Sequence, residues 1–361
     1  MQPPVNPTTP IGRAAGAAPP NRFERVHVEE DLEHLVDVEE PASPRRVPTV
    51  FLPDQSRTII AQNNSPDVPF RYSINPYRGC EHGCAYCYAR PGHEMLGMNA
   101  GLDFETRIMV KYDAPRLLRS ELADERWQGE LIALSGVTDC YQPAERKFRL
   151  TRGCLEVLLE ARHPLGIVTK NALVVRDLDL LAPLAQQNLA HVYVSVTTLD
   201  DDLARTMEPR TATPAARLRA IRALADEGVP VGVMVAPIIP GLNDHEIPAI
   251  LEAAKQSGAQ AAGYLLLRLP LAVRPIFEQW LADNLPDRAS RVLTLIRTTR
   301  AGRMNDTQWG RRMRGQGPYA DGIEQTVSVF RQKLGLDRGL PPLDSTQFVP
   351  PRIDTGQLRL F

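Results

Sequence analysis

Three closely spaced cysteines are the residues best suited to chemistry in this sequence. Cys80, Cys84 and Cys87 lie in the segment RGCEHGCAYCYAR with a C-x3-C-x2-C spacing. Thiolates on one short loop can converge on a single metal centre. Gly79 and Gly83 permit unusual backbone angles and the close approach of a bulky inorganic cluster. The spacing therefore predicts a metal centre on this loop.

The spacing alone leaves the type of metal centre open. A structural zinc site needs a fourth ligand, and His82 lies in the right neighbourhood. An iron–sulfur cluster held entirely by protein needs a fourth cysteine. A four-iron cluster held by three cysteines instead keeps one iron open for a substrate or cofactor. The nearby positive charges of Arg78 and Arg90 favour thiolates and a negatively charged cluster.

Alternating strand and helix patterns surround this loop. Strands are predicted at 72–75, 107–111, 131–136, 166–169, 192–197 and 231–236, with a seventh at 262–267. Helices are predicted at 114–125, 145–162, 177–187, 214–227, 244–257, 276–284 and 322–334. The alternation indicates an α/β fold with a parallel sheet, as either an open doubly wound sheet or a full or partial (β/α) barrel. Both place ligands at the carboxyl ends of strands.

The 361-residue chain divides into three predicted regions. Residues 1–50 form a Pro/Ala-rich leader that we expect to be disordered, because nine of the 32 prolines fall there beside an acidic run. Residues 51–285 form the core domain. Residues 286–361 form a helical extension whose segment 297–314 carries six arginines against one acid, a charge of +5.

Composition narrows the classes of function. A net charge of −1 excludes whole-molecule attraction to nucleic acid or to an anionic membrane. Five cysteines are too few for a secreted disulfide framework, which favours a reducing compartment. Neither a signal-peptide pattern nor a long apolar stretch is present, so we expect a soluble cytoplasmic protein without a membrane partner.

The cysteine loop resembles that of the radical S-adenosylmethionine (SAM) superfamily. The pattern C-x3-C-x-aromatic-C, with Tyr86 before Cys87, follows the first strand of the core. The resemblance implies a partial (β/α)6 TIM-like barrel and a [4Fe–4S] cluster bound by the three cysteines. The open iron would bind SAM, and an electron from a donor such as flavodoxin or ferredoxin would cleave it. The 5′-deoxyadenosyl radical formed would abstract hydrogen from the substrate.

The resemblance also implies a set of cofactor contacts at strand ends. Thr138 and Asp139 would bind the amino or carboxylate end of SAM, although either could simply cap a helix. Lys170 would meet the methionyl carboxylate, and Ser195 the ribose or the methionyl part. An exposed lysine and a core hydroxyl are the competing interpretations.

The fifth strand of the family fold ends in an apolar and Gly-containing motif that flanks adenine. Ile239 and Gly241 match this motif, although a Pro-Gly turn before a helix cap explains the same residues. After an earlier strand end, Glu208 and Arg210 could line the substrate entrance or form a salt-bridged loop.

Within the superfamily, the chain resembles an uncharacterised bacterial family grouped with spore photoproduct lyase, a DNA repair enzyme. The similarity extends from about Ser65 to Leu285 and rests on the segments SPDVPFRYSINPYRGCEHGCAYCYARPGHE, GLDFETRI, TDCYQP and MVAPIIPGLND. It implies that Tyr86 and Tyr88 take part in radical propagation or cofactor contacts. The hydrogen-donating cysteine of that enzyme aligns with Gly136, and Cys140 follows instead, as a relocated donor or as a small neutral residue.

The substrate stays open at this point. The lyase resemblance implies DNA repair or nucleic-acid modification, and the arginines with Trp309 could grip phosphates and stack bases. The same arginines could instead pair with carboxylates of the barrel or leader. Modification of a protein or small molecule is the alternative within enzymes. A non-catalytic zinc-stabilised binding protein, with His82 as fourth ligand, is the alternative from another class.

Overall fold

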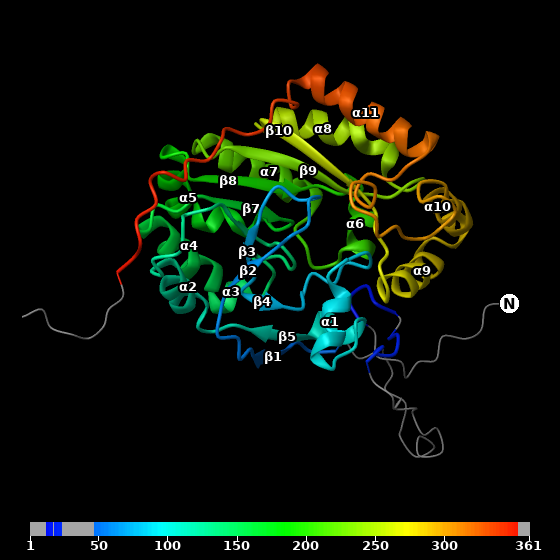
Figure 1. The fold of residues 1–361 in the computed structure, drawn as a ribbon. Coiled ribbons are helices and arrows are strands. Elements are labelled where there is room, and N and C mark those ends of the chain that lie inside the picture. Colours follow the sequence, from blue (N-terminus) through cyan, green and yellow to red (C-terminus); the bar gives the residue numbers. More distant parts are fainter. Residues whose placement is uncertain (1–11, 17, 24–46, 353–361) are drawn as a thin grey trace, which may run out of the picture.

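The main feature of the computed structural model is one seven-stranded sheet, and the model describes residues 12–16, 18–23 and 47–352. The strand order is β10-β9-β8-β7-β6-β3-β2, as Figure 1 shows. The strands are β2 (Ile60–Gln62), β3 (Tyr72–Ile74), β6 (Ile132–Leu134), β7 (Leu165–Thr169), β8 (Ala190–Ser195), β9 (Val231–Ile238) and β10 (Ala261–Leu266). All neighbours pair in parallel except the edge strand β2.

Six of these strands, β3 and β6 to β10, form an open, partial barrel because the two edge strands of the sheet do not pair with each other. Apolar side chains dominate the strands, and buried residues of the strands and helices merge into one large core. The predicted partial (β/α)6 architecture is confirmed, and it brings the carboxyl ends of the strands to one end of the sheet.

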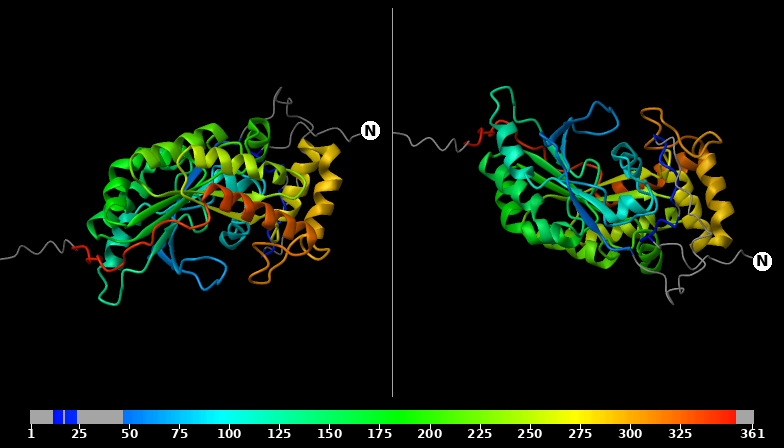
Figure 2. Two further views of the ribbon diagram at one scale, coloured as in Figure 1. Left: turned by 90° about the horizontal axis from the view of Figure 1, so that it is seen from above. Right: turned by 90° about the horizontal axis from the view of Figure 1, so that it is seen from below.

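Helices cover the outer face of the sheet, as the two views of Figure 2 show. They are α2 (Ala114–Leu122), α4 (Leu150–Glu160), α5 (Leu178–Gln186), α7 (Pro214–Asp226) and α8 (Ile247–Gln256). The short helices α3 (Glu145–Phe148) and α6 (Asp201–Met207) lie in the connections that follow β6 and β8. The C-terminal extension is helical as predicted, because α9 (Val273–Asn284) is followed by α10 (Pro286–Thr298) and α11 (Pro318–Leu334). No helix of the described residues is long and apolar enough to cross a membrane.

Two details of the predicted fold are wrong. The strand at 107–111 is β5 (Arg107–Val110), which follows the short helix α1 (Leu102–Thr106) and lies outside the barrel. It pairs with β1 (Val50–Pro53) and β4 (Tyr77–Arg78) in a separate sheet. The helix predicted at 145–162 is two helices, α3 and α4, because Arg149 between them has a left-handed φ of 53°.

Part of the predicted disordered leader packs against the cysteine loop. Most of the leader lies outside the described residues. In the described part, the Asn21 amide donates to the carbonyls of Glu94 and Met98, at 3.0 and 3.2 Å. Arg13 lies within 3.6 Å of Glu81 as an ion pair. Residues 12–16 and 18–23 are therefore fixed to the core domain by polar contacts.

Candidate active site

The cysteine loop begins where β4 ends, and its backbone is held by turns. The Cys80 N–H donates to the carbonyl of Phe104 at 2.9 Å, and the Cys87 N–H to that of Cys84 at 3.3 Å. Cys80 and Cys84 are buried, Cys87 is half-buried, and none of the three is in a disulfide. The loop thus presents three free thiols from two successive turns.

Two glycines shape the loop through their backbone angles and through close contacts with other side chains. Gly79 has a φ of +81°, and a Cβ there would lie 2.8 Å from the His93 ring. Gly83 has a φ of +67°, and a Cβ would lie 2.6 Å from Cβ of Arg13. The unusual backbone angles predicted for these glycines are confirmed, and the missing Cβ atoms also allow His93 and Arg13 to pack closely on the loop.

Arg90 is the internal brace of the loop. This fully buried guanidinium donates to the carbonyl of Cys84 at 2.8 Å and to that of Gly101 at 3.0 Å. It also pairs with the buried carboxylate of Glu105 at 2.5 Å. Arg90 thus fixes the turn around Cys84, and its positive charge is balanced by the carboxylate of Glu105.

Burial is the largest influence on the pKa values of the three thiols. It raises the pKa of Cys80 and Cys84 well above the usual value and also raises that of Cys87. Arg90 lowers the pKa of Cys87, and Lys170 and Arg217 lower that of Cys84, but burial outweighs these cations. Metal binding must then displace a proton from each thiol.

The donor set fits a four-iron cluster better than a single zinc ion. In the described part of the chain, no three His, Cys, Asp or Glu side chains lie in an arrangement that could hold a single metal ion. Cysteines of a four-iron cluster bind different irons and need no common centre. His82 is not free for zinc, because Nε2 accepts from the Asn171 amide at 3.1 Å and Nδ1 lies 3.5 Å from the Asp139 carboxylate.

Lys170 and Ser195, each predicted as a cofactor contact at a strand end, meet inside the barrel. Lys170 follows β7, and its Nζ donates to Ser195 Oγ on β8 at 2.6 Å. The same ammonium donates to the carbonyl of Ala236 on β9 at 2.8 Å. It also lies 5.7 Å from the centre of the Tyr86 ring, which joins this cluster of side chains to the cysteine loop. Three strand ends therefore converge beside Tyr86.

A buried ion pair anchors Tyr86. The Tyr86 hydroxyl donates to the carboxylate of Glu208, which is ion-paired with the fully buried Arg217. Burial alone would raise the pKa of Glu208, but Arg217 and Lys170 outweigh it and hold the pKa below its usual value. Glu208 is therefore an ionised acceptor inside the barrel, not a residue at the substrate entrance.

Thr138 and Asp139 use their polar groups on the protein itself. Thr138 Oγ1 donates to the carbonyl of Tyr77 at 2.7 Å. Asp139 accepts from Thr169 Oγ1 at 2.8 Å and from the Lys170 N–H at 2.7 Å. Asp139 thus ties the loop after β6 to the end of β7 and positions Lys170, whereas Thr138 ties the same loop to β4.

Of the predicted adenine contacts, Ile239 lies with the cysteine loop and Gly241 lies against helix α10. Ile239 is fully buried in the apolar cluster that contains Cys84 and Tyr86. Gly241 has a φ of +76°, and a Cβ there would lie 2.6 Å from Leu295 of α10. The glycine is required by this packing.

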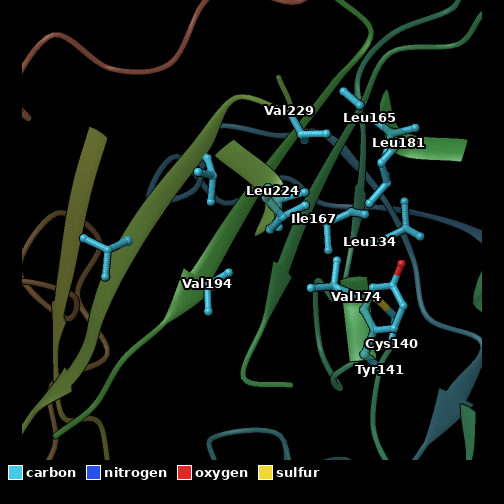
Figure 3. Packing of buried hydrophobic residues seen from close by; sticks show 14 of the residues in the cluster. Leu134, Cys140, Tyr141, Leu165, Ile167, Val174, Leu181, Val194, Leu224 and Val229 are labelled. Atoms are coloured by element: carbon cyan, nitrogen blue, oxygen red, sulfur yellow. The ribbon is translucent and has the colours of Figure 1, made fainter. Parts of the chain in front are cut away.

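Cys140 does not face the entrance of the barrel. Its side chain is 0% exposed and belongs to the main core, next to Tyr141 and Val174 in Figure 3. This burial favours the interpretation of Cys140 as a small neutral residue over that of a relocated hydrogen donor. Tyr88, in contrast, is 49% exposed, and its hydroxyl donates to the carbonyl of Gly136 at 3.1 Å. Tyr88 is thus the accessible tyrosine of the pair.

The radical SAM superfamily model matches residues 74–254, which span the cysteine loop and the strand ends described above. The chain belongs to the radical SAM superfamily. It is an enzyme of a family that uses a [4Fe–4S] cluster and SAM.

The relatives of this radical SAM enzyme include proteins without a described function. An uncharacterized protein of Mycobacterium tuberculosis is 41% identical over 236 residues, 65% of this chain and 69% of the relative. One of Methanocaldococcus jannaschii is 32% identical over 176 residues, 49% of this chain and 63% of the relative. A spore photoproduct lyase complexed with dinucleoside spore photoproduct is 18% identical, with a TM-score of 0.58 over 79% of each chain. That similarity shows a shared fold.

The arginine-rich segment of this radical SAM enzyme is largely tied to the protein. Arg300 is buried and donates to the carbonyls of Leu267 and Arg312, at 2.7 and 2.9 Å. Arg312 pairs with Asp67, and Arg314 pairs with Glu324 at 2.8 Å. These contacts favour the structural interpretation of the segment over nucleic-acid binding.

Sequence reasoning missed Arg217 and Arg268. Arg217 lies on helix α7, where a surface arginine is the ordinary expectation, and no local signal marks its partner Glu208. Arg268 follows β10, and its buried Nε has no hydrogen-bond partner in the described residues. Its Nη1 has only a 3.6 Å contact with the sulfur of Met313. Arg268 directly follows a core strand, and this position alone could have marked it as a candidate site residue.

Proposed function

We propose that this radical SAM enzyme abstracts hydrogen from a nucleic-acid substrate. Cys80, Cys84 and Cys87 would hold the cluster, and SAM would bind beside Tyr86 and Lys170. When bound, the cluster and SAM supply the electron and the hydrogen-abstracting group. The observation that carries the proposal is the meeting of Lys170 and Ser195 beside a tyrosine of the cysteine loop.

Lys170 suits the carboxylate of SAM. Its ammonium has three N–H donors, and two are used by short bonds to Ser195 and to the carbonyl of Ala236. The third has only a 3.4 Å contact with Thr197 Oγ1, which a carboxylate can replace. Tyr86 is fixed by Glu208, so its ring forms a rigid wall of the cofactor site.

Tyr88 and Arg268 support a nucleic-acid substrate. The half-exposed Tyr88 ring can stack on a base, and Arg268 has guanidinium donors available for a phosphate. The fold is shared with a spore photoproduct lyase whose structure contains a dinucleoside lesion. Gly136 stands at the position of that enzyme's donor cysteine, and the Tyr88 hydroxyl lies against its carbonyl. We therefore assign substrate contact and hydrogen return to Tyr88 rather than to Cys140.

Anaerobic reconstitution tests the radical SAM chemistry. Iron and sulfide are added, followed by dithionite and SAM, and 5′-deoxyadenosine is quantified. We expect cluster-dependent formation of 5′-deoxyadenosine, and Lys170→Met should reduce it by weakening SAM binding. Stoichiometric zinc without an iron–sulfur signal would refute the proposal.

A second assay tests the substrate. Irradiated and untreated DNA and RNA are offered to the reconstituted enzyme with deuterated SAM, and mass changes are measured. Tyr88→Phe should retain 5′-deoxyadenosine formation and lose product. If nucleic acid neither binds at low salt nor changes mass, the substrate is a protein or a small molecule.

A further inference from the structure

An arginine-lined cleft of about 740 Å³ lies beside the cysteine loop, on residues that neither cofactor nor substrate uses in the proposed function. Its walls come from residues 143 and 146 at α3, 171–176 after β7, and 210–216 at the start of α7. Arg146, Arg176 and Arg210 are among the lining residues, and no lining residue is Asp or Glu. This composition suits an anionic partner.

The carboxylates that balance these arginines are buried. Arg176 pairs with Glu145 at 2.8 Å and with Asp177 at 2.7 Å, and Arg210 pairs with Glu81 at 2.8 Å. All three carboxylates are shielded from solvent, whereas Arg146 is exposed and has no carboxylate partner in the described part of the chain. The amino end of α7, capped by Thr213, adds a positive partial charge to the wall. The cleft therefore exposes guanidinium groups to solvent while their carboxylate partners are buried.

The cleft wall touches the residues between two cluster ligands. The Arg210 N–H donates to the carbonyl of His82 at 3.3 Å. The Asn171 amide donates to Nε2 of His82 at 3.1 Å, and the Arg210 guanidinium bonds to Glu81. Glu81 and His82 follow Cys80 directly and precede Cys84. One hydrogen bond thus separates the cleft wall from the loop that carries the cysteines.

The side chains proposed to bind the cofactor are not part of the cleft lining. Tyr86 and Lys170 do not line it, and the neighbouring His82 and Thr169 are only 2% and 1% exposed. A substrate must touch the reacting atoms, but an electron can travel through bonded and hydrogen-bonded atoms. The cleft therefore fits an electron donor and does not fit a substrate.

We propose that this cleft docks an acidic electron-transfer protein, such as a flavodoxin or ferredoxin, that reduces the cluster. The inference rests on the proposed function, which requires a one-electron reductant. One electron leaves the reduced centre of the donor and enters the cluster, and no bond or proton is exchanged between the proteins. Arginines around the cleft steer and orient the acidic surface of the donor.

Charge reversal at Arg146 tests the docking site. The full-length enzyme is reconstituted as wild type, Arg146→Glu and Arg303→Glu. The last variant carries the same charge change at an exposed arginine outside the cleft lining. Binding of fluorescently labelled flavodoxin and ferredoxin is measured by anisotropy at low and high salt. We expect Arg146→Glu to weaken binding of at least one donor about tenfold at low salt, and Arg303→Glu to leave it near the wild-type value.

A kinetic comparison supplies the second readout. Cluster reduction is followed by absorbance with reduced flavodoxin and, separately, with dithionite, which needs no docking. Arg146→Glu should slow reduction by flavodoxin relative to dithionite. Equal slowing with both reductants, equal effects of both variants, or no binding of either donor by the wild type would each overturn the proposal. Binding of inorganic phosphate to the same variants is a further control. If Arg146→Glu lost phosphate binding but kept donor binding, the cleft would be a small-anion site, and the proposal would be overturned. If no cluster forms, the proposed function fails, and anisotropy still decides the docking site.

Discussion

The cysteine loop and the arginine-rich segment look alike in sequence but differ in what their side chains do. Residues 79–90 and 297–314 are both short, contain glycines and concentrate residues that bind ligands in other proteins. In the first, the three thiols are free and lie within the part of the chain that the superfamily model matches. In the second, Arg300, Arg312 and Arg314 bind protein partners.

The difference lies in where the deciding information is located. Cluster ligands act together because of their spacing on one loop, which the sequence displays. The function of an arginine depends on its partner, and Asp67, which binds Arg312, is 245 residues away in the chain. A local charge of +5 therefore says little until its carboxylates and carbonyls are known. Each region also contains one buried arginine that clamps backbone carbonyls, Arg90 in the loop and Arg300 in the segment.

Removing one thiol of the cysteine loop should have the largest effect of all the substitutions considered. It tests whether the loop binds a cluster. We expect Cys84→Ser to reduce iron from about four atoms per chain to near zero after reconstitution, because two thiols cannot hold the cluster. Iron, sulfide and the visible spectrum report the result. Cys154→Ala is the matched control, since this cysteine is buried in the core away from the loop. Full iron content in Cys84→Ser would remove Cys84 from the ligand set.

The two regions should also respond differently to pH. Burial raises the pKa of the thiols, so they are protonated near neutral pH, and cluster binding as thiolates releases protons. Iron affinity of the loop should therefore rise as pH increases from about 7 to about 8, by up to about tenfold for each proton released. Burial lowers the pKa of Arg300 only to about 10, so the segment keeps its charge over this range. Competition with a chelator at each pH measures the affinity, and an affinity independent of pH would contradict this prediction.

Arg90→Met tests how strongly the loop depends on its brace. It leaves the buried Glu105 without its guanidinium, so unfolding free energy should fall by about 3–5 kcal/mol. Denaturant unfolding of the apoprotein measures this. In a Glu105→Gln background the same substitution should cost less, because no buried charge is left unpaired. An equal cost in both backgrounds would show that the ion pair is not the source.

The sequence predicts most of the barrel and places two candidate site residues, Lys170 and Ser195, at strand ends. Strand runs separated by helices indicate a parallel sheet, and parallel strands bring their carboxyl ends together. That rule is sufficient to place Lys170 near Ser195, which are 2.6 Å apart between Nζ and Oγ. It does not assign the strand at 107–111 to its sheet, because its partners at 50–53 and 77–78 depend on tertiary contacts.

Residues whose function depends on a distant partner could not be predicted. Glu208 was a candidate entrance residue because it follows a strand end. Its partner Arg217 lies on the next helix, and no sequence pattern indicates this ion pair. Cys140 was a candidate hydrogen donor because it follows a strand end. It is buried in the main core next to Tyr141 and Val174 in Figure 3, and the Thr151 hydroxyl of α4 donates to its carbonyl at 2.7 Å.

Arg300→Met tests the clamp in the arginine-rich segment. Its guanidinium binds carbonyls of Leu267, Arg311 and Arg312, some of which would lose their only charged donor. Unfolding free energy should fall by about 2–3 kcal/mol, less than for Arg90→Met, because no buried carboxylate is left behind. Thermal and denaturant unfolding measure the change. A loss as large as that of Arg90→Met would show that the two clamps are equivalent.

Arg303→Met should have the smallest effect. It removes a positive charge from the arginine-rich segment without removing a side-chain contact. Arg303 is exposed and makes no side-chain hydrogen bond or ion pair with the described residues. Its removal should change unfolding free energy by less than about 0.5 kcal/mol. DNA binding measured against salt concentration should also keep its slope, since the proposed phosphate contact is Arg268 rather than this segment. A reduced slope in Arg303→Met, with unchanged stability, would return nucleic-acid binding to the arginine-rich segment and break the contrast with the cysteine loop.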